Sequence, residues 1–183
     1  MKNIVLIFLF TLSAVFYFEC ARAQSISDGV KLNIILHPVQ TITINSSQKG
    51  SDLQYLIKED YEKGVTATFD DHLAVTSSGG FQVNVASNRK NFTSSGSTES
   101  IPVSDVSISA VNGSENSLTS IFENVVLSTK PESLIKSSIG GRNLKYSITY
   151  DNYAGSSYKY INKNQGKLDA VFTTEITYTI TSK

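Results

Sequence analysis

The chain has 183 residues, with 16 basic and 16 acidic side chains, two His, one Cys and no Trp. This length fits one domain, and a balanced charge gives no electrostatic reason to bind nucleic acid or an anionic membrane surface. Two His and one Cys leave few ligands for a zinc or iron–sulfur site, so we expect no metal and no cofactor.

The first 23 residues have the layout of a secretory signal peptide. Lys2 gives a positive start, residues 4–18 are almost wholly apolar, and the segment ends in Ala21-Arg22-Ala23. A membrane-spanning helix needs about 20 apolar residues, and this run stops at Glu19. The alternative is a lipoprotein signal that is cleaved just before Cys20. Such signals have small residues before the Cys, whereas this chain has an aromatic residue and an acidic residue there. We expect cleavage after Ala23 and export to the periplasm, the cell surface or the medium.

The predicted mature chain, residues 24–183, is rich in hydroxyl groups and has no Cys. Ser and Thr make up 41 of its 160 residues. β-Branched and aromatic residues alternate with polar ones, which favours strands, and no helical stripe persists for two turns. We therefore predict an all-β domain without thiol chemistry.

The first half contains the clearest turn signals. Strands are predicted over residues 30–36 and 39–45, separated by Pro38, and the only helix candidate is Asp52–Gly64, whose charged end stops at the glycine. Two later strands, which include Leu73–Val75 and Phe81–Val85, flank Gly79-Gly80 and predict a hairpin.

The second half predicts further short strands. These cover residues 101–111 with a bend near Ser104-Asp105, 121–127, 144–150 and 168–181. In the last strand one face is apolar and the other hydroxylated, as in an antiparallel sheet with one wet side. About eight to ten such strands, separated by turns, indicate a two-sheet sandwich.

Three stretches resemble small exported bacterial surface proteins. Leu73–Val85 is similar to their core hairpin, Leu144–Tyr150 to their penultimate strand, and Gly166–Thr181 to their Thr-rich terminal strand. Families with this layout include spore-coat-U-like and fimbrial subunits and WxL-type cell-wall modules. The chain has neither the Trp motif nor the disulfide of these families, so no functional residue is carried over. The resemblance implies an immunoglobulin-like sandwich on, or shed from, a bacterial envelope.

Tyrosines are concentrated near the end of the chain, and they are the candidate binding residues. Tyr146 and Tyr150 follow the strand alternation and are expected in the core. Tyr153, Tyr158 and Tyr160 fall in a polar loop over residues 152–166, where exposed rings can stack on sugars. The alternative is that these rings pack over the end of a sheet.

Other candidate sites are weaker. Asp70-Asp71-His72 offers oxygen ligands for a cation, or is a solvated turn. No Gly-x-Ser-x-Gly motif surrounds any Ser, and the carboxylates are scattered singly, so we predict that the protein is not an enzyme.

The expected function is a non-catalytic structural or adhesin-like subunit, similar to a pilin, whose partners are itself, other envelope subunits or a surface glycan. The alternative is a carbohydrate- or peptidoglycan-binding module that uses the Tyr loop. If the terminal strand is a sheet edge, its free backbone can join a neighbour's sheet; the other reading is a paired central strand. We expect no nucleic-acid partner and no membrane span in the mature form.

Overall fold

A computed structural model describes residues 27–95, 97–163 and 169–183. The predicted signal peptide, residues 1–23, lies outside these ranges. The chain divides into a unit up to Leu36 and a unit from His37 to Lys183. No helix in the described ranges is long and apolar enough to cross a membrane.

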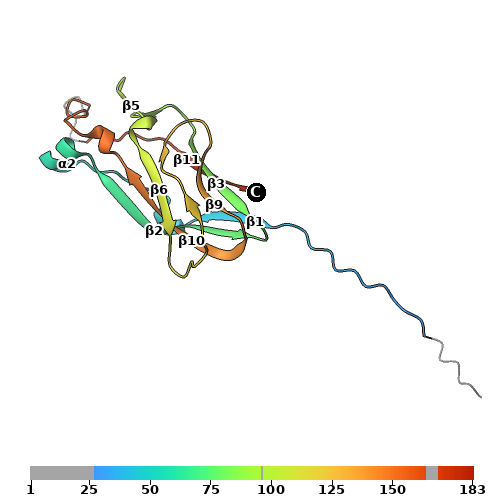
Figure 1. The fold of residues 1–183 in the computed structure, drawn as a ribbon. Helices are drawn as coiled ribbons and strands as arrows, with labels where there is room; N and C mark the ends of the chain where they lie inside the picture. The colour runs from blue at the N-terminus through green and yellow to red at the C-terminus, as the bar shows by residue number, and fades with distance from the viewer. Residues whose placement is uncertain (1–26, 96, 164–168) are drawn as a thin grey trace, which may run out of the picture. The chain divides into compact units, whose positions relative to one another are not determined.

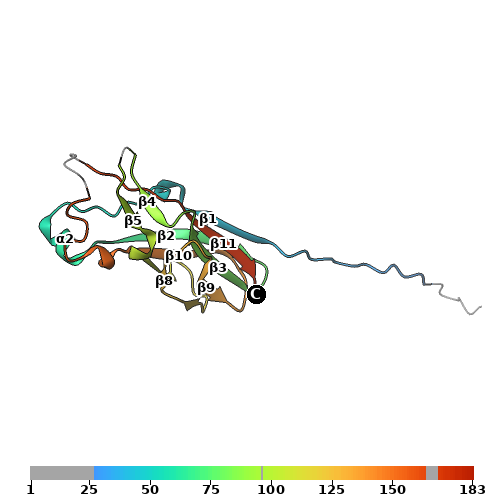
Figure 2. The ribbon, with the colours of Figure 1, turned by 90° about the horizontal axis from the view of Figure 1, so that it is seen from above.

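The second unit consists mainly of antiparallel strands, which confirms the predicted all-β class (Figures 1 and 2). Sheet A has the strand order β1 (Gln40–Ile44), β2 (Thr66–Ser77), β10 (Gly141–Asp151), β6 (Ser107–Asn112), β8 (Val125–Val126). Sheet B has the order β11 (Ile176–Ser182), β3 (Phe81–Ser87), β9 (Glu132–Ser137), β7 (Ile121–Phe122). A small ribbon joins β4 (Asn91–Thr93) and β5 (Ser100–Pro102). Short helical segments are η1 (Ser46–Gln48), α2 (Lys58–Lys63), η2 (Val103–Asp105) and η3 (Tyr153–Gly155).

One apolar core lies between the two sheets. Alternate residues of each strand point inward because successive side chains in a strand face opposite sides. The core includes Leu73 and Val75 of β2, Val83 of β3, and Tyr146 and Ile148 of β10. As predicted, Tyr146 and Tyr150 belong to this core.

The predicted hairpin about Gly79-Gly80 is wrong. β2 pairs with β1 and β10, whereas β3 pairs with β11 and β9, so the turn carries the chain from one sheet to the other. Ser77 is buried and its hydroxyl donates to the Gly79 carbonyl at 2.7 Å, which closes the turn locally. Both strands have an apolar inner face, and crossing between sheets lets those faces pack against each other.

A second crossing turn, from β9 to β10, packs against the first. The same serine-to-carbonyl hydrogen bond closes this turn, because buried Ser137 donates to the Ile139 carbonyl at 2.7 Å. A Cβ on Gly140 would lie 2.1 Å from the Ser77 carbonyl oxygen, and a Cβ on Gly80 would lie 2.9 Å from the Ser138 carbonyl oxygen. The two glycines therefore allow the turns to approach each other closely. β9 is not among the strands predicted from the sequence.

Several predicted strands differ from those observed. Residues 30–36 form no strand, because the described chain provides no partner strand for them. Residues 121–127 split into β7 and β8, which belong to different sheets. The bend predicted near Ser104-Asp105 is confirmed as η2, which separates β5 from β6.

The predicted helix is confirmed as α2, and the terminal strand is shorter than predicted. Gly64 ends α2 with a positive φ of 79°, and its N–H donates to the Asp60 carbonyl. A Cβ there would lie 2.5 Å from the Asn152 carbonyl oxygen, so glycine is required for close approach as well as for φ. β11 begins only at Ile176, and it forms the edge of sheet B in the strand order of the described residues.

Candidate functional site

The Tyr-bearing loop is anchored by a buried carboxylate. Asp105 in η2 accepts hydrogen bonds from the Tyr160 hydroxyl at 2.7 Å and from Lys159 Nζ at 2.7 Å. Asn152 donates to the Asp105 carbonyl at 2.9 Å and accepts from the Tyr55 hydroxyl. This network connects the loop after β10 to η2 and to the segment before α2.

The three candidate tyrosines lie in different environments. Tyr153 is 71% exposed, Tyr158 is 36% exposed, and Tyr160 is only 7% exposed. The Tyr160 ring also contacts the Tyr55 ring edge-on, with centroids 5.6 Å apart. The fold thus leaves Tyr153 as the ring most accessible to a ligand, while Tyr160 holds the loop in place.

Electrostatics support the structural role of Tyr160. Burial and its hydrogen bond to Asp105 raise the pKa of Tyr160, and burial together with the nearby Asp105 charge raises the pKa of Tyr55. Both phenols therefore stay protonated and act as donors. Tyr158 donates to Glu62 on α2, and this hydrogen bond raises the pKa of Tyr158 and lowers that of Glu62.

Asp70-Asp71-His72 forms a bulge in β2, where three residues oppose Ser147 alone on β10. Asp71 adopts a left-handed φ of 52°, and its carboxylate accepts hydrogen bonds from the Ser114 backbone N–H at 2.7 Å and from the Ser114 hydroxyl. These bonds lower the pKa of Asp71. Across the described ranges, no group of three or more His, Cys, Asp or Glu could hold a metal ion.

The bulge turns His72 into the core, where it joins a directional chain of hydrogen bonds. Gln48 Nε2 donates to the Asp70 carbonyl, so Gln48 Oε1 faces His72 and Nδ1 is the protonated nitrogen. His72 Nε2 then accepts from the Tyr150 hydroxyl at 3.1 Å, and Tyr150 accepts from Tyr178 at 2.6 Å. Every polar atom of the His72 ring is satisfied in the neutral form, and burial lowers its pKa.

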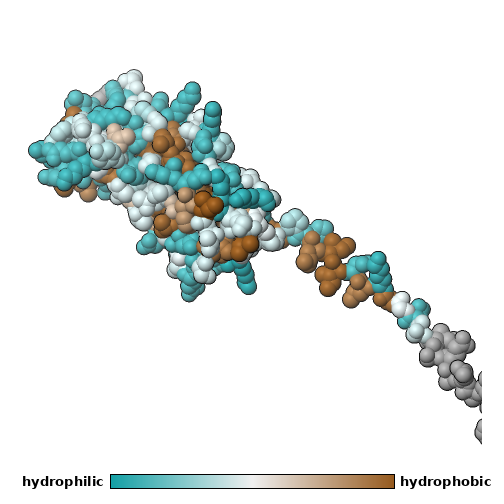
Figure 3. Space-filling model, viewed as in Figure 1, coloured by the Kyte–Doolittle hydropathy of each residue, from teal (hydrophilic) through white to brown (hydrophobic). Residues whose placement is uncertain are grey.

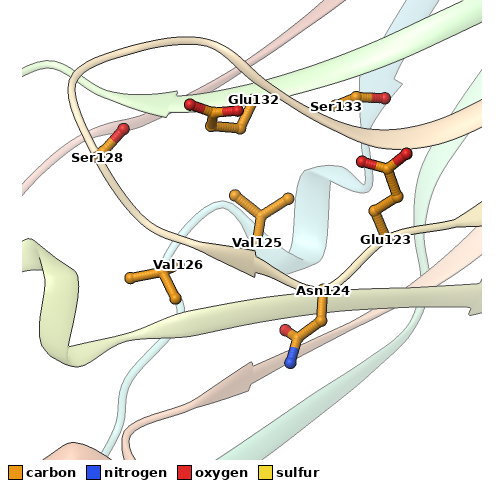
Figure 4. A pocket seen from close by; sticks show the side chains of 7 residues that line it. All are labelled: Glu123, Asn124, Val125, Val126, Ser128, Glu132 and Ser133. Atoms are coloured by element: carbon orange, nitrogen blue, oxygen red, sulfur yellow. The ribbon is translucent and has the colours of Figure 1, made fainter.

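A hollow of about 320 Å³ lies beside β8 and β9 (Figure 4). Its lining residues are mostly polar: Glu123, Asn124, Val125, Val126, Ser128, Glu132 and Ser133. Glu123 is already paired with Lys136 at 2.5 Å. The lining contains carboxylates and hydroxyls but no His or Cys to form a nucleophile–base pair.

A second hollow, of about 340 Å³, is lined by Ile42, Thr43, Ile44, Lys49 and Tyr178. It lies where β1, the edge of sheet A, meets β11, the edge of sheet B. Its walls are mainly aliphatic and aromatic, unlike those of the first hollow.

The segment from Val30 to Leu36 is the most exposed apolar stretch in the described ranges (Figure 3). Five of its seven residues are apolar and each is 75–95% exposed: Val30, Leu32, Ile34, Ile35 and Leu36. Four of them recur at every second position, which is the pattern of a strand with one face to bury. Exposed apolar surface on this scale is unusual for a folded protein in water.

No known protein-family model matches the chain, and no curated protein sequence matches it. The resemblance to coat-U-like, fimbrial and WxL-type proteins therefore stays a prediction.

Sequence reasoning identified the Tyr loop and the alternation of residues 30–36, but missed the hollow between β1 and β11. That hollow depends on two strands more than 130 residues apart, β1 and β11, meeting at their edges. No local pattern signals such a meeting.

Proposed function

We propose that the protein is an exported, non-catalytic structural subunit that assembles with other copies of itself at a cell surface or outside the cell. The observation that carries this proposal is the exposed, alternating Val30–Leu36 segment. Extended segments of this kind bind by adding a strand to an exposed sheet edge. β1 and β11 are such edges, each with one paired neighbour in the described strand order.

We also propose that the fold is an immunoglobulin-like sandwich and that a signal peptide is removed from it. Two antiparallel sheets that share one core support an immunoglobulin-like sandwich. The apolar run before Glu19 and the Ala-x-Ala end support a cleaved signal peptide.

The free energy of burying this segment and the entropic cost of ordering it predict weak assembly. Burying a Val, Leu or Ile side chain contributes about 1.5–3 kcal/mol, whereas fixing the backbone of one residue costs about 1–2 kcal/mol. With five apolar side chains in seven residues the two contributions are comparable. Ladder hydrogen bonds and a complementary surface must supply the net affinity, so we expect association that depends on concentration.

A matched pair of charge substitutions tests this function. Ile34→Asp places a carboxylate on the apolar side of the segment, and Asn33→Asp places the same charge on the neighbouring polar position. Sedimentation of the mature chain, residues 24–183, should show self-association of the wild type and the Asn33→Asp variant, and monomers for Ile34→Asp. A wild-type chain that stays monomeric at high concentration would exclude self-assembly.

The exposure of Tyr153 favours glycan or peptidoglycan binding as a second candidate function. Its ring stands 71% exposed at η3, on a loop fixed by Asp105. Tyr153→Ala should then lower retention on insoluble peptidoglycan or polysaccharide by a factor of about five, because stacking of an aromatic ring contributes roughly 1 kcal/mol. Tyr158→Ala serves as the comparison on the same loop, and equal retention of wild type and Tyr153→Ala would remove this candidate.

A further inference from the structure

The edges of the two sheets meet at one side of the core without joining. β1 and β11 lie side by side along this seam (Figure 2), but no ladder connects them among the described strands. At one end of the seam the Ser182 hydroxyl lies 3.4 Å from the Gln40 side chain, in an exposed contact. Further along, the seam contains the hollow lined by Ile42, Ile44 and Tyr178. The seam can therefore open without breaking a ladder.

Beneath the seam, a chain of three side chains ties β11 to sheet A. Tyr178 of β11 donates to Tyr150 of β10 at 2.6 Å, and Tyr150 donates to Nε2 of His72 on β2 at 3.1 Å. Within the described ranges, Tyr150 is the only hydrogen-bond partner of the Tyr178 hydroxyl. Burial raises the pKa of both tyrosines, so each hydroxyl keeps its proton and donates one hydrogen bond. The chain of donors therefore runs from sheet B to sheet A.

A proton added to His72 reverses this chain of donors. Nδ1 already carries a proton and lies 3.0 Å from Gln48 Oε1, so the new proton goes to Nε2. Nε2 must then donate to the Tyr150 oxygen and Tyr150 must donate to Tyr178, which leaves the Tyr178 proton in need of a new acceptor. Tyr178 lines the hollow of about 340 Å³, and a water occupies about 30 Å³ in the liquid. Water in the seam can accept this proton.

The neighbouring elements offer no counter-charge to a protonated His72 ring. β1, η1, β3 and β11 contain no charged side chain. The titratable groups that face the ring are Tyr150 from β10 and Tyr178 from β11, and both are neutral phenols. An imidazolium at this place would be a buried charge without a partner, which is strongly unfavourable.

The charged residues nearest to His72 in the sequence or beside the seam do not change this. Asp70 is exposed, and the Asp71 carboxylate already accepts hydrogen bonds from the Ser114 backbone and hydroxyl. Lys49 lines the hollow together with Tyr178, and its positive charge disfavours a second cation there. The remaining way to stabilise the imidazolium is hydration, and the seam is the place where water is nearest to the chain of donors.

We propose that the seam between β1 and β11 opens when the His72 ring takes up a proton from solvent, while the other strands stay paired. Water then enters beside Tyr178 and hydrates the imidazolium. Partial openings of this kind are a normal property of folded domains and involve the elements with the fewest partners. Because an opening that exposes His72 is favoured by proton uptake, mild acid promotes it. This inference concerns a single domain and does not rest on the proposed assembly.

Hydrogen exchange followed by mass spectrometry tests this opening. The protein is residues 24–183 with Ile34→Asp, so that association between copies does not protect the edges. Rates at about pH 7.5 and about pH 5.5 are corrected for the intrinsic pH dependence of amide exchange. We expect β1 and β11 to be less protected than β6 at both pH values, and their protection to fall by up to about tenfold in acid. The reason is that a hydrated His is about nine-tenths protonated one unit below its ordinary pKa.

Two variants and one internal reference isolate the role of His72. His72→Gln should abolish the acid response of β1 and β11, whereas His37→Gln should keep it. Residues 121–127 contain β7 and β8, the opposite edges of the two sheets, and should show no such response. The proposal is wrong if β1 and β11 are protected as well as β6, if their protection is the same at both pH values, or if residues 121–127 respond equally.

Nitrogen-15 NMR of the His72 ring provides a second readout. We expect the neutral ring with its proton on Nδ1 at about pH 7.5, and imidazolium signals in acid only together with the loss of protection in β1 and β11. Imidazolium signals with unchanged protection of these strands would overturn the proposal, because the closed core would then hold the charge.

Discussion

Gly140 lies where the turn between β9 and β10 meets the turn between β2 and β3. A methyl group there would lie 2.1 Å from the Ser77 carbonyl oxygen, a backbone atom that cannot move aside cheaply. We predict that Gly140→Ala lowers the free energy of unfolding by about 1–3 kcal/mol, the usual cost of overpacking. Gly79→Ala is the control, since nothing lies within 4 Å of a Cβ at that position. Urea unfolding followed by circular dichroism measures both, and equal midpoints would contradict the close packing of the turns.

His72 makes stability depend on pH. Burial lowers its pKa below the ordinary value of 6.5, so the unfolded chain binds the proton more tightly than the folded protein. Its contribution to the free energy of unfolding is therefore complete above about pH 6.5 and is lost as the pH falls through the lower folded-state pKa. We predict that stability is lost in the window that begins as the pH falls below about 6.5.

Two His variants isolate this effect. The pH dependence in that window should disappear in His72→Gln, whatever its absolute stability, and persist in His37→Gln. The midpoint of urea unfolding at several pH values provides the measurement. A slope unchanged in His72→Gln would show that another group is responsible.

At the scale of elements, the loop after β10 depends on its buried anchor. Tyr160→Phe keeps the ring but removes a donor to Asp105, which leaves a buried carboxylate oxygen without that partner. We predict a loss of about 1–3 kcal/mol in the free energy of unfolding and faster amide exchange over residues 153–163. Tyr153→Phe, at an exposed ring, should change neither. Unchanged exchange in Tyr160→Phe would mean that other contacts, such as those of Lys159 with Asp105 and Tyr158 with Glu62, fix the loop without this hydroxyl.

At the scale of the whole molecule, assembly couples stability to concentration. A partner that binds only the folded state raises the apparent unfolding temperature by mass action. We predict that the Tm of the wild type rises with protein concentration and that the Tm of Ile34→Asp does not. Differential scanning calorimetry over a hundredfold concentration range tests this, and parallel behaviour of the two proteins would count against assembly through Val30–Leu36.

The elements were predictable where their pattern is local. α2 ends at Gly64 because a positive φ favours glycine, and β10 alternates Tyr146, Ile148 and Tyr150 because one face is buried. The hairpin about Gly79-Gly80 was not predictable. Two consecutive strands show the same alternation of apolar and polar residues whether they pair with each other or lie in opposite sheets. Which of the two arrangements forms depends on strands that are distant in the sequence.

The candidate residues also divide into those predictable from neighbouring residues and those that depend on distant contacts. The sequence alone determined that the chain is all-β, that residues 30–36 are amphipathic at period two, and that the late tyrosines gather in one loop, because each is a property of neighbouring residues. The tertiary structure decided that Tyr160 is buried on Asp105, that His72 is turned into the core by a bulge, and that β1 and β11 leave an apolar hollow. These outcomes depend on contacts between residues far apart in the chain, where burial and pairing override local preference.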